Sequence, residues 1–154
     1  MIHQYGEKTN IMTLLTEFKS RRGTLRCSAS EAFRFVSDLR NFRQFIHDIR
    51  VDDLKIDSDA CSFHISPVGE VKMSISAKVP DKEVHYTGSL LKPDDFLLQL
   101  ELNENSIGVA EVDITARADL NPALRMMATK PVEKFLEGLI SEMEKFRNWN
   151  DIIK

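Results

Sequence analysis

The segment from Asn121 to Phe146 constrains the fold most, because it is the one long stretch with sustained helical periodicity. Its apolar residues recur at three- or four-residue spacing, which places them on one side of a helix. They are Leu124, Met127, Ala128, Val132, Phe135, Leu139, Met143 and Phe146. A helix with such an apolar stripe is stable only when the stripe packs against another element. We therefore expect the preceding residues to form a surface that receives this helix.

The ends and the middle of this segment indicate one helix with a bend. Asn121 is a favourable helix cap, and Pro122 is tolerated at the first helical position. Pro131 lies inside the pattern, where it removes one backbone hydrogen bond and bends the helix. Lys130 would be a poor cap for a new helix, so we predict one bent helix rather than two.

Between residues 54 and 119 the sequence alternates apolar and polar residues, with turn residues at 57–59, 67–69, 80–81, 92–95 and 103–105. Strict alternation is typical of strands that bury one face and wet the other. The clearest strand has Val71, Met73, Ile75, Ala77 and Val79 on its apolar face. Short connections between consecutive strands favour antiparallel pairing. We predict six strands that form a sheet covered on one side only.

The first part of the chain predicts one more strand and two short helices. Residues 13–27 favour a strand, but the apolar phase slips within it, and a bulge at Gly23 would reconcile the two halves. Ser28 and Glu31 have the spacing of a capping box before a helical run. Asn41 could cap a second short helix. The predicted order is a strand, two short helices, six strands and one long helix.

Length and charge limit the class of protein. The chain of 154 residues is most simply one domain at 13–148, with a poorly ordered lead-in at 1–12 and a tail at 149–154. We expect Trp149 to make a contact at the rim of the domain. The net charge of −3 argues against nucleic acid as a partner. No apolar run is long enough to span a bilayer.

The two cysteines indicate a compartment. Cys27 and Cys61 lie in strand-like segments far apart in the sequence, and the first residues do not have the pattern of a signal peptide. We therefore expect two free, buried thiols and a cytoplasmic protein, although a disulfide between them is an alternative.

Two segments resemble a known superfamily. The segment SASEAFRFVSDLRNFRQFI, at 28–46, and the Asn121–Phe146 helix with its Asn-Pro entry and internal Lys-Pro are similar to SRPBCC proteins, also called START-like or birch-pollen-allergen-like. The resemblance covers residues 13–146 and does not identify a subfamily. It implies an α+β helix-grip fold, in which a curved antiparallel sheet of about seven strands wraps around the long C-terminal helix.

The resemblance also implies a cavity between helix and sheet that binds a hydrophobic small molecule, such as a lipid, a quinone or a polyketide-like compound. By that resemblance the cavity-facing residues are Phe63, Met73, Ile75, Tyr86, Leu98, Leu100, Ala116, Met127 and Phe135. Periodicity independently places these residues on inner faces, but it does not show that the space is open. The alternative is that neighbouring side chains fill it, as in an ordinary core.

The inner faces carry little that could perform catalysis. Tyr86 is a weak candidate for a catalytic acid, and a hydroxyl at the edge of the core is the simpler interpretation. His64 and His85 fall on the outer faces of their strands, whereas His47 could line the cavity mouth. No metal-ligand spacing or phosphate-binding glycine loop occurs, so we expect no metal and no cofactor.

Three functions therefore remain open from the sequence. The leading hypothesis is a carrier or sensor of a hydrophobic small molecule. Family members also include polyketide cyclases and co-chaperone domains, so a cyclase or dehydratase on a hydrophobic substrate and a ligand-free protein-interaction module are the alternatives. The sequence does not distinguish a monomer from a homodimer.

Overall fold

The computed structural model describes residues 15–46, 52–90 and 93–150. The predicted lead-in at 1–12, His47 and residues 151–154 lie outside this part of the chain. The elements follow in the order β1 Thr16–Lys19, β2 Gly23–Leu25, α2 Ala29–Val36, η1 Leu39–Phe42, α3 Arg43–Ile46, β3 Asp52–Ile56, β4 Ala60–Ile65, β5 Gly69–Val79, β6 Glu83–Ser89, β7 Phe96–Ser106, β8 Val109–Ala118 and α4 Pro122–Lys145.

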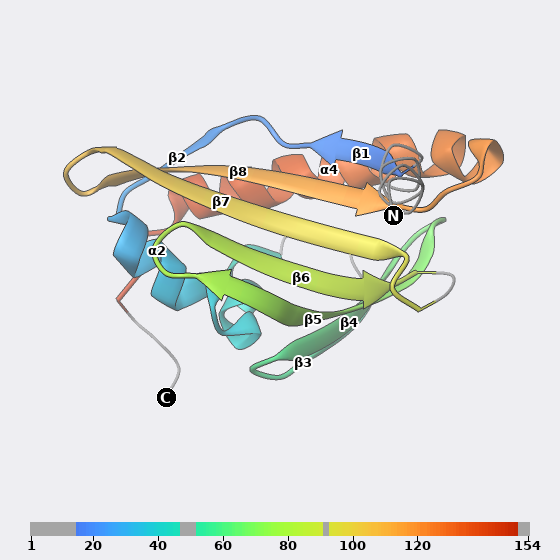
Figure 1. Ribbon diagram of the computed structural model, residues 1–154, viewed down its shortest axis with the longest axis horizontal. Coiled ribbons are helices and arrows are strands. Elements are labelled where there is room, and N and C mark those ends of the chain that lie inside the picture. The colour runs from blue at the N-terminus through green and yellow to red at the C-terminus, as the bar shows by residue number, and fades with distance from the viewer. Residues whose placement is uncertain (1–14, 47–51, 91–92, 151–154) are drawn as a thin grey trace, which may run out of the picture.

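Within the described residues the strands form one eight-stranded antiparallel sheet in the order β1-β8-β7-β6-β5-β4-β3, with β2 also paired to β8. Figure 1 shows the sheet in front, with α4 running behind β7 and β8 and the short helices at one end. The buried side chains of β7, β8 and α4 belong to one apolar core. The predicted α+β helix-grip fold, with short helices after the first strand, is confirmed.

The first strand is divided into β1 and β2, and the division explains the slip in its apolar pattern. β1 pairs Thr16 with Ala118, whereas β2 pairs Gly23 with Val112. From Lys19 to Gly23 this edge advances by four residues, whereas its partner β8 advances by three, from Thr115 to Val112. The edge therefore contains one extra residue, as a bulge does. Gly23 itself packs closely under α4, because a Cβ there would lie 2.9 Å from Ile140 Cγ2.

The two short helices are held by local hydrogen bonds. The capping box of Ser28 and Glu31 is confirmed, since each side chain accepts a backbone N–H from the other residue. The prediction that Asn41 caps the second helix is wrong. Asp38 caps η1 by accepting the Arg40 N–H, while the buried Asn41 side chain donates to the Phe35 carbonyl at 2.8 Å. Asn41 therefore ties η1 to α2.

Helix α4 is one helix that passes through Pro131, as predicted, and Asn121 caps it by accepting the Leu124 N–H. After α4 the chain brings one side chain, that of Trp149, back to the core. Trp149 is 1% exposed, so the expected rim contact is wrong. Its ring packs against Phe35, Phe45 and Phe146, with centroids 5.1–5.6 Å away. This aromatic cluster joins the short helices to the end of α4.

Two strands differ from the predictions, one in where it ends and one in how much of it is buried. The turn expected at 103–105 is wrong, because β7 continues to Ser106 and the chain turns at Gly108, whose φ is +77°. The apolar face of β5 is shorter than its alternation suggested, since Val79 is 40% exposed. The β5–β6 register shifts between Ile75 and Ala77, so the strand beyond that point no longer faces the core.

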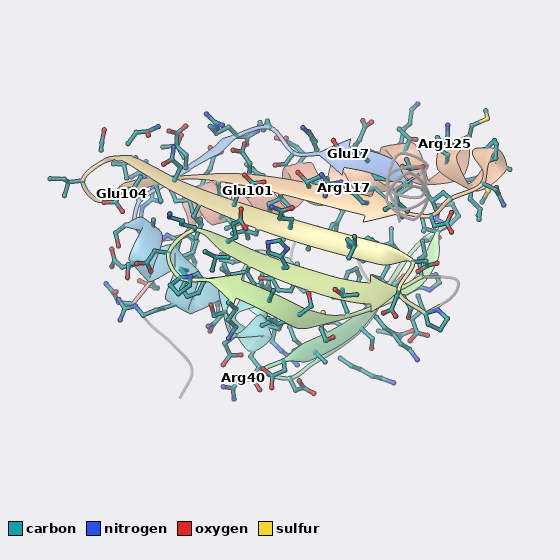
Figure 2. The ribbon with its side chains drawn as sticks, in the orientation of Figure 1. Glu17, Arg40, Glu101, Glu104, Arg117 and Arg125 are labelled. Carbon is teal, nitrogen blue, oxygen red and sulfur yellow. The ribbon has the colours of Figure 1, made fainter. Side chains whose placement is uncertain are left out.

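Ion pairs at the surface connect β1 and its loop to the rest of the fold. Arg21 contacts Glu137 and Glu144 of α4 at 2.9 and 2.8 Å. Glu17 of β1 accepts from Arg117 of β8 at 2.9 Å, and Figure 2 shows the two side chains together on neighbouring strands. The Arg21 side chain therefore joins this edge of the sheet to α4.

Candidate functional site

An apolar cavity lies between the sheet and α4. Its lining comes from β1, β4, β5, β7, β8, α4 and the turns between strands. The lining residues are Phe18, Phe63, Ile65, Val68, Val71, Leu90, Phe96, Leu98, Ala116, Ala118, Leu120, Ala128, Val132, Phe135 and Leu136. All of these side chains are hydrocarbon. The site can therefore solvate an apolar group and offers no side chain for chemistry.

The free space in the cavity is about 30 Å³, which admits a water molecule but is far below the roughly 300–1,000 Å³ of typical ligand pockets. The Phe63 and Phe135 rings stack across it, with centroids 5.5 Å apart and planes 19° apart. A ligand the size of a lipid or a quinone therefore enters only if these walls move. Three lining residues are only partly buried: Val68, Leu90 and Val132. Because fewer neighbouring side chains surround them, this is where the walls can move most easily.

The structure brings four of the nine residues expected from the family resemblance to this cavity. They are Phe63, Leu98, Ala116 and Phe135. Met73 and Leu100 are buried elsewhere in the core, and Ile75 packs against it. Met127 is 48% exposed, because the next residue, Ala128, is the one that α4 turns inward.

Sequence reasoning left several lining residues out of the proposed site. Phe18, Ile65, Val71 and Ala118 all had the inward parity, so alternation alone identified their face. Leu90 likewise continues the inward parity of the strand that contains Tyr86, whereas Val68 and Leu120 lie in or next to turns, where no periodicity operates. A turn residue's contact with a cavity depends on long-range packing, and no local pattern gives it.

Tyr86, the weak catalytic candidate, lies outside the cavity and is 0% exposed. Its hydroxyl donates to the Val36 carbonyl at 3.0 Å, at the end of α2. Burial raises the pKa of the Tyr86 phenol well above its ordinary value. The hydroxyl thus serves as a fixed link between β6 and α2.

We expect Tyr86→Phe to lower the free energy of unfolding by about 1 kcal/mol, because the Val36 carbonyl loses one hydrogen-bond donor in a buried place. Urea unfolding followed by circular dichroism measures this. Binding of an apolar probe to the cavity should be unchanged. A variant that folds as stably as wild type but loses probe binding would contradict the structural role.

The remaining polar candidates do not converge on the cavity. His85 contacts Glu83 at 2.9 Å on the outer side of β6, and His64 is partly buried on the outer side of β4. A shallow depression of about 910 Å³ crosses the same outer region and is lined by Ser62, Lys72, Ser74 and Thr87 among others. It carries hydroxyls and charges but no aromatic side chain.

Metal and thiol chemistry find no support in the described part of the chain. No group of three or more His, Cys, Asp or Glu residues there could hold a metal ion, and no helix there is long and apolar enough to cross a membrane. Cys27 and Cys61 are free and buried, as predicted. Burial raises the pKa of each thiol to about 12, so both are protonated at neutral pH and poor nucleophiles.

Comparison with solved structures identifies the fold. A START superfamily protein from Mycobacterium smegmatis superposes with a TM-score of 0.62 and 11% identity, over 84% of this chain and 94% of that one. This chain has the helix-grip fold of START-like proteins. A protein from Thermus thermophilus gives a TM-score of 0.61 at 14% identity, over 84% and 95% of the two chains.

A third similar structure is an Aha1 dimer from Colwellia psychrerythraea, with a TM-score of 0.53 and 14% identity over 84% of this chain and 96% of that one. No protein-family model and no curated protein sequence matches this chain. The expected resemblance to the SRPBCC superfamily is therefore confirmed at the level of the fold. Sequence identities this low show that the fold is shared, and they assign no role to individual residues.

Proposed function

We propose that this protein binds a hydrophobic small molecule between the sheet and α4. The observation that supports this most directly is that the cavity between the sheet and α4 is lined entirely by hydrocarbon side chains. Burial of apolar surface is worth about 25 cal/mol per Å², so even a small hydrocarbon gains free energy there. Lipids, quinones and polyketide-like compounds all carry such groups.

Binding requires the cavity to grow beyond about 30 Å³. We expect the stacked pair of Phe63 and Phe135 to move, because rotation of either ring breaks no hydrogen bond. A ligand then stabilises the open arrangement, because its apolar surface is buried only when the rings have moved apart. The apparent affinity is lowered by the cost of separating the rings.

The first experiment is native mass spectrometry of the protein purified from its own host, followed by organic extraction. A co-purified lipophile would establish the class of ligand. A neutral fluorescent lipophile, N-phenyl-1-naphthylamine, then gives a binding assay that needs no knowledge of that ligand.

Val132→Phe tests the location. The added atoms exceed the free space of about 30 Å³, so we expect probe affinity to fall at least about tenfold. Fluorescence titration measures this. Val109→Phe is the matched control, because Val109 is 38% exposed and does not line the cavity. Equal probe binding by both variants would exclude this cavity as the site.

A second candidate function is an interaction module that holds no ligand. The small volume of the cavity favours it, as does Ile107, which is fully exposed at the tip of the β7–β8 hairpin. A pull-down from host lysate with wild type and Ile107→Asp distinguishes it: a partner lost in the variant, with no lipophile extracted, would support this function. No observation of comparable weight supports a cyclase or dehydratase.

A further inference from the structure

One polar atom stands out beside the apolar cavity. The Thr16 Oγ1 is shielded from solvent and has no hydrogen-bond partner. It is the only such side-chain nitrogen or oxygen within residues 15–46, 52–90 and 93–150. A shielded hydroxyl without a partner costs free energy, because it gives up its bonds to water and receives nothing in return. Such an atom in an otherwise satisfied structure calls for a functional explanation.

The pairing of β1 places this hydroxyl at the border of the cavity. Thr16 lies two residues before Phe18, so both side chains are on the same face of β1. Thr16 is also the direct partner of Ala118 on β8, which brings their side chains next to each other. Phe18 and Ala118 both line the cavity. Thr16 is therefore adjacent to two of its walls, and its hydroxyl, which does not itself line the open space, meets a ligand only when those walls move apart.

The position along α4 is consistent with this. Gly23 of β2 packs under Ile140, and the extended chain from Gly23 back to Thr16 covers roughly 23 Å. The same length along α4 is roughly 15 residues, which leads back to the first turns of the helix. Figure 1 shows β1 beside that end of α4. Ala128 of these turns lines the cavity, so Thr16 sits at its α4 N-terminal end.

The surrounding charges restrict what this hydroxyl can bind. A threonine hydroxyl donates one hydrogen bond and accepts others. No lining side chain carries a positive charge, so a carboxylate or phosphate there would be buried without a counter-ion. A neutral carbonyl or hydroxyl oxygen of a ligand can form a hydrogen bond with the Thr16 hydroxyl without the free-energy cost of burying a charge.

We propose that Thr16 is the polar anchor of the cavity, and that its ligand carries one neutral oxygen at the end of a hydrocarbon body. The proposal rests on the proposed binding function and narrows its ligand class. It excludes pure hydrocarbons as the preferred ligands and free fatty acids bound by a buried carboxylate. Thr129, the nearby hydroxyl of α4, does not compete, because it already donates to the Arg125 carbonyl at 2.7 Å.

The test compares cyclohexane with cyclohexanone, which share a ring and differ by one carbonyl oxygen. Dissociation constants for wild type and Thr16→Val are measured by NMR titration. We expect Thr16→Val to weaken cyclohexanone binding about fivefold and to leave cyclohexane binding unchanged. Thr24→Val is the matched control, because Thr24 lies in β2 on the exposed face. It should change neither constant.

The outcomes separate this proposal from the one on which it rests. If wild type binds both probes and Thr16→Val alters neither constant, the anchor is overturned and the cavity remains the site. If neither probe binds wild type, the binding function and the anchor both fail. A melting temperature for Thr16→Val that is unchanged or raised by up to about 3 °C supports an unpartnered hydroxyl. A fall of several degrees would show that the hydroxyl has a partner and would overturn the anchor.

Discussion

Gly88→Ala should lower the free energy of unfolding by about 3 kcal/mol or more, because the added methyl group has nowhere to go. A Cβ at this position would lie 1.9 Å from the Lys72 carbonyl oxygen and 2.9 Å from Met73 Cα. Both atoms belong to the backbone of β5, which pairs with β6 at this point. Relief of the clash therefore requires the two strands to separate and lose pairing. Urea unfolding followed by circular dichroism measures the loss.

Gly23→Ala provides the control, since it is the same chemical change against a different kind of neighbour. Its Cβ would lie 2.9 Å from Ile140 Cγ2 and 3.0 Å from Val112 Cγ1, which are ends of side chains and can shift. We expect a loss of about 1 kcal/mol there. Equal losses for the two variants would show that the β5–β6 approach is looser than the structure has it.

The two glycines also show where sequence reasoning stops. Gly23 was expected at a bulge, and the register shift between β1 and β2 confirms that the strand is interrupted nearby. Its contact with Ile140 could not be predicted, because that contact joins residues far apart in the chain. Gly88 fitted the inner-face alternation of its strand, and nothing local indicated that a backbone carbonyl would occupy the place of its side chain.

The fold was predictable because its signals are local and repeat. Alternation defined the strands, and three- and four-residue spacing defined α4. The errors lie where a local preference competes with tertiary structure. The polar residues at 103–105 favour a turn, yet β7 continues because all three pair with β8 or border that pairing, and Gly108 with its positive φ takes the turn.

The site was predictable in part for a related reason. Parity places Phe63, Leu98 and Ala116 on inner faces, but it does not distinguish a cavity wall from filled core. Met73 and Leu100 have the same parity and lie away from the cavity. Parity also places Thr16 on the same face of its strand as Phe18, but it does not show that the hydroxyl lacks a partner, because only the completed packing decides that.

Trp149→Ala should cost about 4 kcal/mol, because it removes the largest fully buried side chain of the described core. The indole contacts Phe35, Phe45 and Phe146 and donates through Nε1 to the Phe146 carbonyl at 3.2 Å. Truncation leaves a void among three aromatic rings that cannot all close on it. Since these rings belong to α2, α3 and the residue that follows α4, the void loosens the contact between the short helices and the long one.

Trp149→Phe separates packing from the hydrogen bond. Phenylalanine keeps most of the ring contacts and removes Nε1, so we expect a loss of about 1–2 kcal/mol. Circular dichroism is the measurement, because Trp149 is the single tryptophan and both variants abolish its fluorescence. In wild type that fluorescence reports directly on the aromatic cluster and should change in the same urea range as the dichroism. A loss below about 1 kcal/mol for Trp149→Ala would mean that Trp149 does not pack into the core and belongs to the tail that the sequence suggested.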